Sequence, residues 1–424
     1  DYEFANNNPV SKSMQKMLDL VDDEIKTEAE NERLQKFYEY VRTTVGDITD
    51  AVGRQRLIVE LYDKFFKVAS PKTVEKLGIV YTPVEVVDFI IHSVGYLIQK
   101  EFGRSLSDEN VHILDPFTGT GTFITRLLQS GYIRKEDFAR KYSNEIHANE
   151  IVLMAYYIAS INIENVYHSL VNEDNYKSFD GICLTDTFQL GEETNEDGFY
   201  SEQFPINSKR VIAQKKNKIT IIISNPPYSI GQKSTNDNAQ NQTYPKLEKH
   251  IEDTYVLESR ANLKKSAYDS YVKAFRWASD RLSNKDGGII GFVSNGKWLE
   301  ASGLDGMRKC LEREFSTIYV FNLRGNQRTS GELSRKEGGK IFGSGSRTSI
   351  AITILVKHPN KPLNQKAKIY YHDIGDYLSQ KDKLNIINNF GDINNPQMKW
   401  TKLEPDQYGD WINHRNEMFR LFTP

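Results

Sequence analysis

Residues 111–122 have the sequence VHILDPFTGTGT, and this stretch decides the fold class. Its first four residues favour a short apolar strand that ends at Asp115, and a glycine-containing turn then leads into a helix that reaches Leu128. Strand, tight turn and helix in this order are typical of open α/β sheets, which bind ligands at the carboxyl ends of their strands. The stretch therefore predicts a mostly parallel sheet with a ligand site beside Asp115.

The composition of the turn narrows the kind of ligand. Gly119 and Gly121 let the backbone approach a ligand closely, and the helix that follows offers its N-terminus to a carboxylate or phosphate. A dinucleotide-binding turn would need glycine at the position of Ile124, which disfavours NAD. The acidic Asp115 suits a ligand with a positively charged amine, such as S-adenosylmethionine. A plain glycine-rich turn without a ligand is the alternative.

Strands and helices alternate on both sides of this stretch. Apolar runs predict strands at 79–81, 146–151, 219–223, 288–293, 317–323 and 349–356, and amphipathic runs predict helices at 84–98, 119–128 and 268–282, with another ending at 161. We therefore expect a Rossmann-like α/β sheet with helices on both faces. Residues 10–70 carry apolar side chains at helical spacing and few glycines or prolines, which predicts a small all-helical domain before the sheet.

The chain divides into three predicted regions. Residues 1–75 form the helical domain, 76–375 the α/β domain, and 376–424 a linker with the start of a further, truncated region. The last boundary rests on a weaker pattern and frequent Asn and Asp after residue 357. The first residue is Asp1 rather than Met, which indicates a processed or excised piece.

Composition limits the compartment and the partners. No apolar run approaches the roughly 20 residues of a membrane span. The two cysteines, Cys183 and Cys310, form neither a disulfide framework nor a zinc site, so we expect a cytoplasmic protein. The net charge of −2 disfavours nonspecific coating of nucleic acid. Basic clusters at 208–218 and 324–340 are compatible with local phosphate contacts and equally with solvated loops.

A second motif follows an apolar strand at 221–228, where the sequence is IIISNPPY. Pro226 and Pro227 fix φ and lack backbone N–H groups, so they hold the Asn225 side chain rigidly at the strand's end. An aromatic amine that acts as a nucleophile needs acceptors for its two hydrogens, which the Asn225 side-chain oxygen and the Pro226 carbonyl can supply. Tyr228 adds a face on which an extruded base can stack. A proline-rich turn that only closes the strand is the alternative.

Together, DPFTGTG at 115–121 and NPPY at 225–228 resemble the motif pair of amino-group DNA methyltransferases that modify adenine. Residues 78–357 resemble more closely the methyltransferase part of single-polypeptide Type ISP restriction-modification enzymes. The strings that carry this resemblance are SIGQKS and NDN at 229–238, YDSY and FRWASD at 268–280, and LRGN and RTSGE at 323–332. Residues 1–75 resemble the helical coupler between helicase and methyltransferase in the same family.

The resemblance implies a set of residues that bind S-adenosylmethionine: Tyr81, Thr82, Asp115, Pro116, Phe117, Gly119, Gly121, Thr122, Glu150, Asp186, Thr187 and Asn225. Thr82 would bond the methionine carboxylate, although a helix cap before Pro83 explains it equally well. Glu150 would hold the ribose hydroxyls, with Glu145 as the competing candidate. Asp186 would lie beside the adenine, and Phe188 or Phe117 would pack on that ring unless they are ordinary core residues.

The resemblance also implies residues for the base and the DNA. The catalytic residues are Asn225, Pro226, Pro227 and Tyr228, the base-stacking residues are Tyr228 and Phe342, and the DNA-backbone residues are Arg324, Arg328, Arg335 and Lys336. A phenylalanine in the core is the alternative for Phe342. The eight histidines show no metal-ligand spacing, so no metal is expected. Residues 291–298 miss a phosphate loop because Trp298 replaces the magnesium-binding Ser or Thr.

The predicted function is site-specific N6-methylation of adenine in double-stranded DNA by a restriction-modification enzyme. The predicted partners are a helicase and nuclease upstream and a target-recognition domain downstream in the same polypeptide. The alternatives are methylation of RNA, of protein glutamine or of the exocyclic amine of cytosine, and a catalytically silent DNA-binding or coupling module. No reactive-cysteine motif lies near either site, which disfavours methylation at a cytosine ring carbon. The DNA recognition sequence is not encoded in these motifs.

Overall fold

The computed structural model describes residues 7–18, 82–171, 176–192, 204–228, 243–261, 264–342, 347–362 and 364–414. Its centre is a nine-stranded sheet in the order β3-β2-β1-β4-β5-β7-β6-β8-β9. The strands are β1 (His112–Asp115), β2 (Ile146–Glu150), β3 (Ile182–Leu184), β4 (Ile219–Ser224), β5 (Gly288–Asn295), β6 (Thr317–Arg324), β7 (Ile350–Lys357), β8 (Lys368–Asp373) and β9 (Thr401–Leu403). The predicted strand at 79–81 lies outside the described residues.

The direction of the strands determines where a ligand can bind. Strands β1 to β5 are parallel to their neighbours in the order β3-β2-β1-β4-β5, whereas β7 is antiparallel to both β5 and β6. The chain extends from β1 toward β2 and β3 on one side and then returns to β4 on the other. The topological switch point therefore lies between β1 and β4, at the edge where Asp115 ends its strand.

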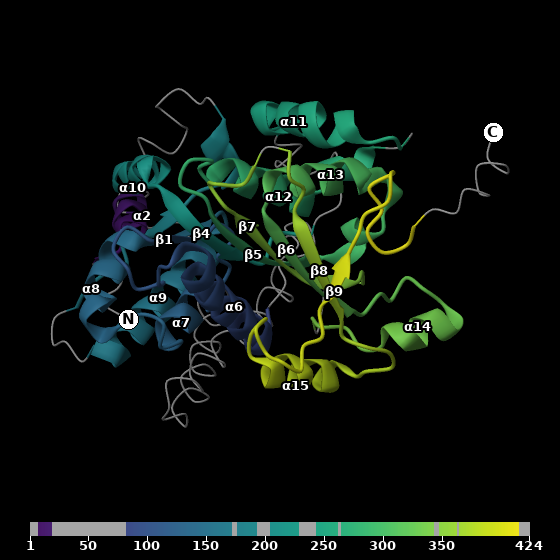
Figure 1. Ribbon diagram of the computed structural model, residues 1–424. Coiled ribbons are helices and arrows are strands. Elements are labelled where there is room, and N and C mark those ends of the chain that lie inside the picture. Colours follow the sequence, from purple (N-terminus) through teal and green to yellow (C-terminus); the bar gives the residue numbers. More distant parts are fainter. Residues whose placement is uncertain are drawn as a thin grey trace, which may run out of the picture.

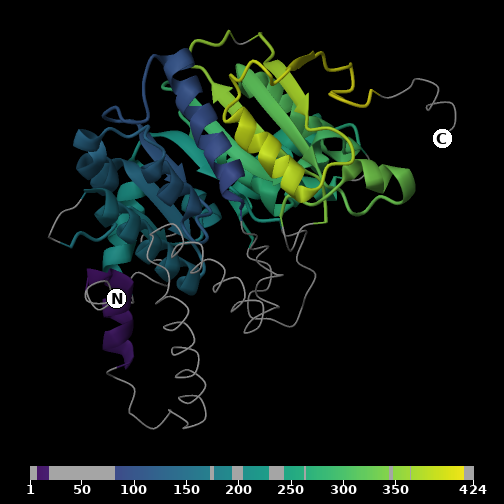
Figure 2. The same ribbon diagram turned by 90° about the horizontal axis from the view of Figure 1, so that it is seen from below.

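Helices cover both faces of the sheet (Figure 1). One face carries α6 (Val84–Phe102), α7 (Thr122–Gln129), α9 (Leu153–Val171) and α15 (Gln380–Phe390), and the other carries α11 (Pro245–Ile251), α12 (Ser270–Arg281) and α13 (Asp305–Glu314). Figure 2 shows α6 and α15 side by side on the first face. Near the edge strand β3, α10 (Pro205–Lys216) packs against α2 (Pro9–Leu18), the helix described in the N-terminal region.

Shorter elements complete the fold. These are α8 (Phe138–Arg140), α14 (Gly331–Glu337) and the single turns η2 (Lys135–Asp137), η3 (Lys141–Glu145), η4 (Phe188–Gly191), η5 (Glu252–Val256), η6 (Lys265–Tyr268), η7 (Gly296–Leu299) and η8 (Ser302–Leu304). In the described residues, no helix is both long and apolar enough to cross a membrane.

Alternating side chains of each central strand supply two separate apolar cores. In β4, Ile221 and Ile223 pack toward α6, and Ile222 packs toward α12. Burial on both faces explains the continuous isoleucine run, because a strand covered on one face only would alternate with polar residues. The predicted α/β sheet with helices on both faces is therefore confirmed.

The predicted boundary at residue 375 does not coincide with a break in packing. Helix α15 lies against α6, the backbone N–H of Ile393 donates to Ser93 Oγ over 3.1 Å, and β9 pairs with β8 at the sheet edge. Trp411 is buried against Trp298, with ring centroids 5.3 Å apart. Residues 376–414 thus complete the sheet and its cover. The sequence pattern missed them because edge strands and one-sided helices carry many polar side chains.

Candidate active site

The loop after β1 is built around a buried carboxylate. Asp115 is fully buried, and its Oδ1 accepts hydrogen bonds from Ser224 Oγ (2.6 Å) and from the Phe117 backbone N–H (3.2 Å). Its Oδ2 is buried and has no hydrogen-bond partner among the described residues. Burial raises the pKa of Asp115 to about 7. Oδ1 therefore serves hydrogen bonds within the protein, and Oδ2 is suited to bind a cationic or hydrogen-bond-donating ligand.

Glycine is required in this loop for conformation and for space. Gly119 and Gly121 have φ values of +57° and +86°, in the left-handed region that L side chains rarely adopt. A Cβ atom on Gly121 would lie 3.2 Å from the Ala159 Cα on α9. The loop can therefore run close to α9 and turn directly into α7, which begins at Thr122.

Glu150 ends the neighbouring strand β2 and joins the same loop. Its Oε2 accepts from the Gly119 N–H over 2.7 Å, and its Oε1 accepts from the Val152 N–H over 2.8 Å. Burial raises its pKa to about 7. The competing candidate, Glu145, lies at the opposite end of β2, where it pairs with Lys141 over 3.1 Å. Of the two acidic residues, the structure thus places only Glu150 beside the glycine loop.

The loop after β3 closes the side of the site away from β4. Thr187 Oγ1 donates to the Pro116 carbonyl, and the rings of Phe188 and Phe117 lie 5.4 Å apart. Asp186 Oδ2 accepts a hydrogen bond from the Tyr244 hydroxyl over 2.8 Å. Burial raises the pKa of Asp186. The predicted cofactor residues after β1 and β3 therefore meet.

Tyr244 is a site residue that the sequence did not reveal. Its hydroxyl binds Asp186, its ring lies 5.2 Å from that of Phe188, and Lys273 Nζ lies 5.1 Å from its ring centroid. Tyr244 belongs to no motif, and only the return of the chain at the start of α11 brings it here. No local sequence signal could have found it.

Asn225 follows β4 and contacts a residue far away in the sequence. Its Nδ2 donates to Thr82 Oγ1 over 2.8 Å, and Thr82 is buried just before α6. The preceding residue, Ser224, donates to Asp115 across the switch point. The Ser224 bond joins the end of β4 to the start of the glycine loop, and the Asn225 bond directs its amide nitrogen toward Thr82, before α6. The predicted neighbour Tyr81 lies outside the described residues.

Comparison with known proteins identifies this arrangement. Residues 54–265, half of the chain, match the family of N-6 DNA methylases, and residues 1–53 match the coupler domain of Type ISP restriction-modification enzymes. The chain belongs to the N-6 DNA methylase family. The predicted resemblance to this family and to Type ISP enzymes is confirmed.

Solved structures of longer proteins contain the same unit. The chain is 48% identical to the Type ISP enzyme LlaGI, solved as a nuclease-deletion mutant with a DNA substrate mimic, with a TM-score of 0.87 over 99% of this chain and 33% of that chain. It is 43% identical to the ATP-dependent Type ISP enzyme LlaBIII bound to DNA, with a TM-score of 0.88 over 98% of this chain and 28% of that chain. The chain is 32% identical to the protein in the DrdV–DNA complex, with a TM-score of 0.87 over 98% of this chain and 39% of that chain.

The chain therefore spans roughly a third of the length of these relatives. Among curated protein sequences, none matches it. The match to the coupler domain covers residues 1–53, and the predicted boundary at residue 75 stays a prediction.

In this methylase, the two predicted base-stacking residues contact each other directly. Tyr228 donates its hydroxyl to the Val293 carbonyl over 3.2 Å, and its ring centroid lies 5.7 Å from that of Phe342 at an interplanar angle of 71°. A base between two rings needs about 3.5 Å on each side and a parallel arrangement. The structure brings Tyr228 and Phe342 together, but the edge-to-face contact leaves no room for a base between them.

The basic residues after β6 divide into two groups. Arg324 Nε binds Asp373 Oδ1 over 2.7 Å, and its Nη1 binds Asp376, so two carboxylates already compensate its charge. These ion pairs lie within the protein, and the predicted DNA-backbone contact of Arg324 stays a prediction. Arg328 and Arg335 are exposed, and Arg335 lies with Lys336 on α14, at one side of the molecule in Figure 1. For these three cations a phosphate contact stays a prediction.

Proposed function

We propose that the chain transfers a methyl group from S-adenosylmethionine to the exocyclic N6 amine of adenine in double-stranded DNA, as the modification part of a restriction-modification enzyme. The observation that carries the proposal is the pair of hydrogen bonds, Ser224 to Asp115 and Asn225 to Thr82, which fixes the proline-containing segment between the end of β1 and the start of α6. Family membership and the DNA-bound structures of LlaGI and LlaBIII support DNA as the substrate.

The residues around the glycine loop fit the cofactor. The buried Asp115 Oδ2, which has no partner among the described residues, and the Glu150 carboxylate offer acceptors to amine and hydroxyl groups. Asp186 and Phe188 provide a polar and an apolar wall for a flat ring. When bound, S-adenosylmethionine supplies a methyl carbon made electrophilic by a sulfonium.

Asn225 and Pro226 then orient the nucleophile. The Asn225 amide oxygen and the Pro226 carbonyl accept hydrogen bonds from the amine of an extruded adenine, which directs the nitrogen lone pair toward the methyl carbon. Positioning of this kind supplies most of the rate enhancement in a direct transfer. Before the base can stack on Tyr228, the edge-to-face contact with Phe342 has to open.

The cysteines argue against attack through a covalent base adduct. Cys183 and Cys310 are both buried, and burial raises the pKa of Cys183 to about 12 and of Cys310 to about 11. A thiol must ionise to attack a pyrimidine ring, and neither can do so near neutral pH. Transfer to an exocyclic amine needs no such thiol.

Calorimetric titration of S-adenosylmethionine tests the cofactor part of the proposal, with Asp115→Ala as control. We expect saturable one-to-one binding that the substitution abolishes. Incubation with labelled cofactor and duplex DNA, followed by nucleoside analysis, tests the reaction. The expected product is N6-methyladenine. Label only in N4-methylcytosine, RNA or protein would exclude the adenine assignment, and a folded chain that binds no cofactor would favour a silent coupling module, for which the coupler match at residues 1–53 argues.

A further inference from the structure

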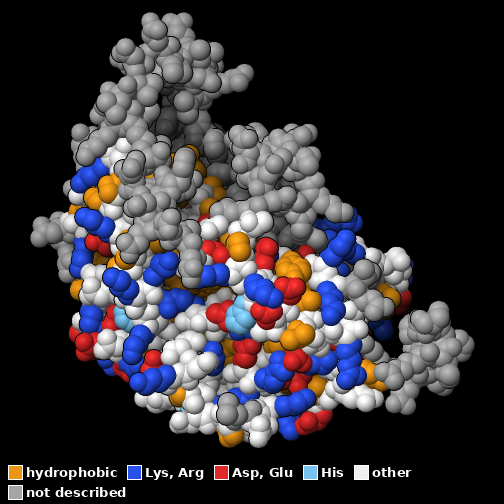
Figure 3. Space-filling view, turned by 90° about the horizontal axis from the view of Figure 1, so that it is seen from above, with side chains coloured by type: hydrophobic (Ala, Val, Ile, Leu, Met, Phe, Trp, Pro, Cys, Tyr) orange, Lys and Arg blue, Asp and Glu red, His pale blue; other side chains and the backbone are white. Residues whose placement is uncertain are grey.

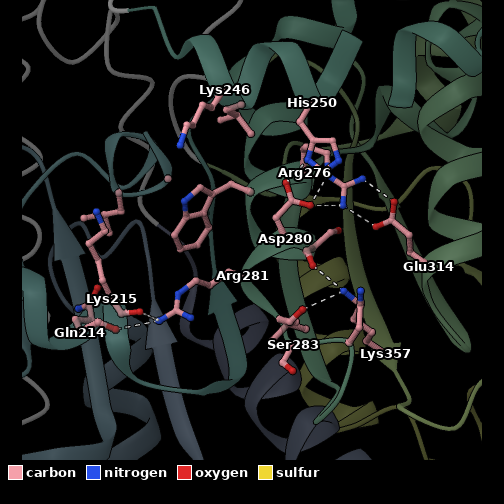
Figure 4. Close-up of a pocket in the computed structure, with 17 residues that line it drawn as sticks. Gln214, Lys215, Lys246, His250, Arg276, Asp280, Arg281, Ser283, Glu314 and Lys357 are labelled. Carbon is pink, nitrogen blue, oxygen red and sulfur yellow. Dashed lines mark hydrogen bonds and ion pairs between the residues drawn. The ribbon is translucent and has the colours of Figure 1, made fainter. Parts of the chain in front are cut away.

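A cavity of about 750 Å³ lies between α10, α11 and α12, apart from the candidate active site (Figure 4). It shares no lining residue with that site. Arg281 and Lys357 line it where β4 and β5 begin, whereas Asn225 follows the end of β4. Cavities of roughly 300–1,000 Å³ are the size of small-molecule binding sites. The cavity is therefore large enough for a ligand of its own.

One side of the cavity is electrically balanced. Arg276 pairs with Asp280 over 2.7 Å and with Glu314 over 2.6 Å, and His250 Nδ1 lies 2.8 Å from the second oxygen of Asp280. Figure 4 shows this network on the side of the cavity away from Lys215 and Arg281. Two carboxylates thus compensate the charge of Arg276.

Arg281 on the opposite side lacks such compensation. Its Nη2 donates to the carbonyls of Gln214 (2.9 Å) and Asn217 (2.8 Å), at the end of α10. In the described part of the chain, its Nε and Nη1 make no hydrogen bond and no carboxylate pairs with it. Burial lowers the pKa of Arg281 because the charged guanidinium has lost water. Carbonyl dipoles alone hold this cation, and an anion would stabilise it further.

Two further cations of the cavity lining also have no carboxylate partner among the described residues. Lys357 Nζ donates to the carbonyls of Ser279 (2.9 Å) and Leu282 (3.0 Å) and to no carboxylate of the described residues. Lys215 is exposed at the rim, and the described residues include no ion-pair partner for it. Lys246 also lines the cavity.

The excess of Lys and Arg over Asp and Glu is found in the cavity lining and does not extend over the whole face. Figure 3, which views the side of the molecule that carries α11, shows Lys and Arg interspersed with Asp and Glu over the surface. Within the cavity lining, by contrast, the cations are Lys215, Lys246, Arg276, Arg281 and Lys357, and the carboxylates are Asp280 and Glu314. The excess of cations is thus local to a concave site, where it attracts anions most strongly.

We propose that this cavity is a phosphate-binding site, in which the open N–H groups of Arg281 and the ammonium of Lys215 bind phosphate oxygens. The Nε and Nη1 hydrogens of Arg281 lie on different edges of the guanidinium, so each can donate a charge-assisted hydrogen bond to a single phosphate oxygen, and Lys215 adds a point charge. The phosphate can come from a free nucleotide or from the backbone of bound DNA. The proposal does not rest on the methyl-transfer proposal, because the two sites have no residue in common.

Calorimetric titration of inorganic pyrophosphate into the 424-residue chain at low salt tests the site. Lys215→Glu is the test variant, and Lys216→Glu is the matched control, because both residues are exposed at the end of α10 but only Lys215 lines the cavity. We expect Lys215→Glu to weaken pyrophosphate binding about tenfold, since the reversed charge lies next to the ligand. Lys216→Glu should change it less than twofold. A titration of S-adenosylmethionine into each variant verifies that the active site is intact.

Competition identifies the source of the phosphate. If a short DNA duplex displaces pyrophosphate from the wild type, the site binds the DNA backbone; if only nucleoside triphosphates displace it, the site binds a free nucleotide. Absence of saturable pyrophosphate binding would overturn the proposal, as would equal affinities of the Lys215→Glu and Lys216→Glu variants. If the wild-type chain binds pyrophosphate but not S-adenosylmethionine, the proposed function is refuted and the phosphate-site proposal stands.

Discussion

The glycine loop after β1 and the proline segment after β4 lie at the same edge of the sheet, but they are held in different ways. The glycine loop is fixed by two buried carboxylates, Asp115 and Glu150, which accept hydrogen bonds from the backbone N–H groups of Phe117 and Gly119. The proline segment is fixed by side-chain bonds of Ser224 and Asn225 and ends at Tyr228, which rests against Phe342. The comparison supports the proposal of a preformed cofactor site beside a base site that has to open.

The largest effect should come from the base side. Asn225→Ala removes an acceptor that acts on the reacting amine only during transfer, so we expect kcat to fall at least about a thousandfold. The dissociation constant of S-adenosylmethionine should change less than about fivefold, because Asp115 and Glu150 remain. Single-turnover methylation and calorimetry measure the two quantities. If kcat and the affinity for S-adenosylmethionine fall by the same factor, the two regions do not act independently.

The matching substitution on the cofactor side is Asp115→Asn, which keeps the shape of the side chain and removes its charge. We expect S-adenosylmethionine to bind about 30- to 100-fold more weakly, as for the loss of a charge-assisted hydrogen bond. Circular dichroism should show an unchanged fold. A variant that binds the cofactor as tightly as the wild type would contradict the role of this carboxylate.

The pH dependence sharpens the comparison, because only the cofactor side holds buried carboxylates. Burial raises the pKa of Asp115 from 3.8 to about 7, so the unbound protein favours the protonated form. The free energy of unfolding should therefore fall as pH rises from about 4 to about 7. A cationic ligand favours the ionised form, so its affinity should rise about tenfold between pH 6 and pH 8.

Thermal melts and cofactor titrations across this range measure both effects. Glu150, whose pKa burial also raises to about 7, titrates in the same window, so the profile belongs to the pair. Asp115→Asn should reduce the slope of both curves. A pH-independent affinity in the wild type would contradict the proposal that these carboxylates bind the ligand in ionised form.

The smallest effect should come from Thr82, which orients the side chain of Asn225. Thr82→Val removes the hydroxyl that accepts from Asn225, and we expect kcat to fall about fivefold because Asn225 is oriented less well. Thr82→Ser retains the hydroxyl and should restore the rate. If Ser and Val behave alike, the threonine contributes only packing.

Much of the site could be predicted because its chemistry lies in short continuous runs. Asp115 with its glycines and Asn225 with its prolines are local motifs, and topology then brings the ends of β1 and β4 together. The ion pairs of Arg324 could not be predicted from the sequence, because Asp373 and Asp376 follow 49 and 52 residues later. Strands β8 and β9 were missed for a related reason, since both carry many partly exposed side chains and form no continuous apolar run.

Arg308 gives the C-terminal segment a mechanical role. Its buried guanidinium donates to the carbonyls of Gly409 (2.7 Å) and Trp298 (2.7 Å) and to the Asp410 carboxylate (2.8 Å). The chain beyond β9 is thereby anchored to η7, the turn that follows the central strand β5. A force applied to the chain beyond Trp411 would act on the Arg308 hydrogen bonds before it acted on the edge strand β9. These bonds would transmit the force to η7 and β5 in the middle of the fold, and β9 would stay paired with β8.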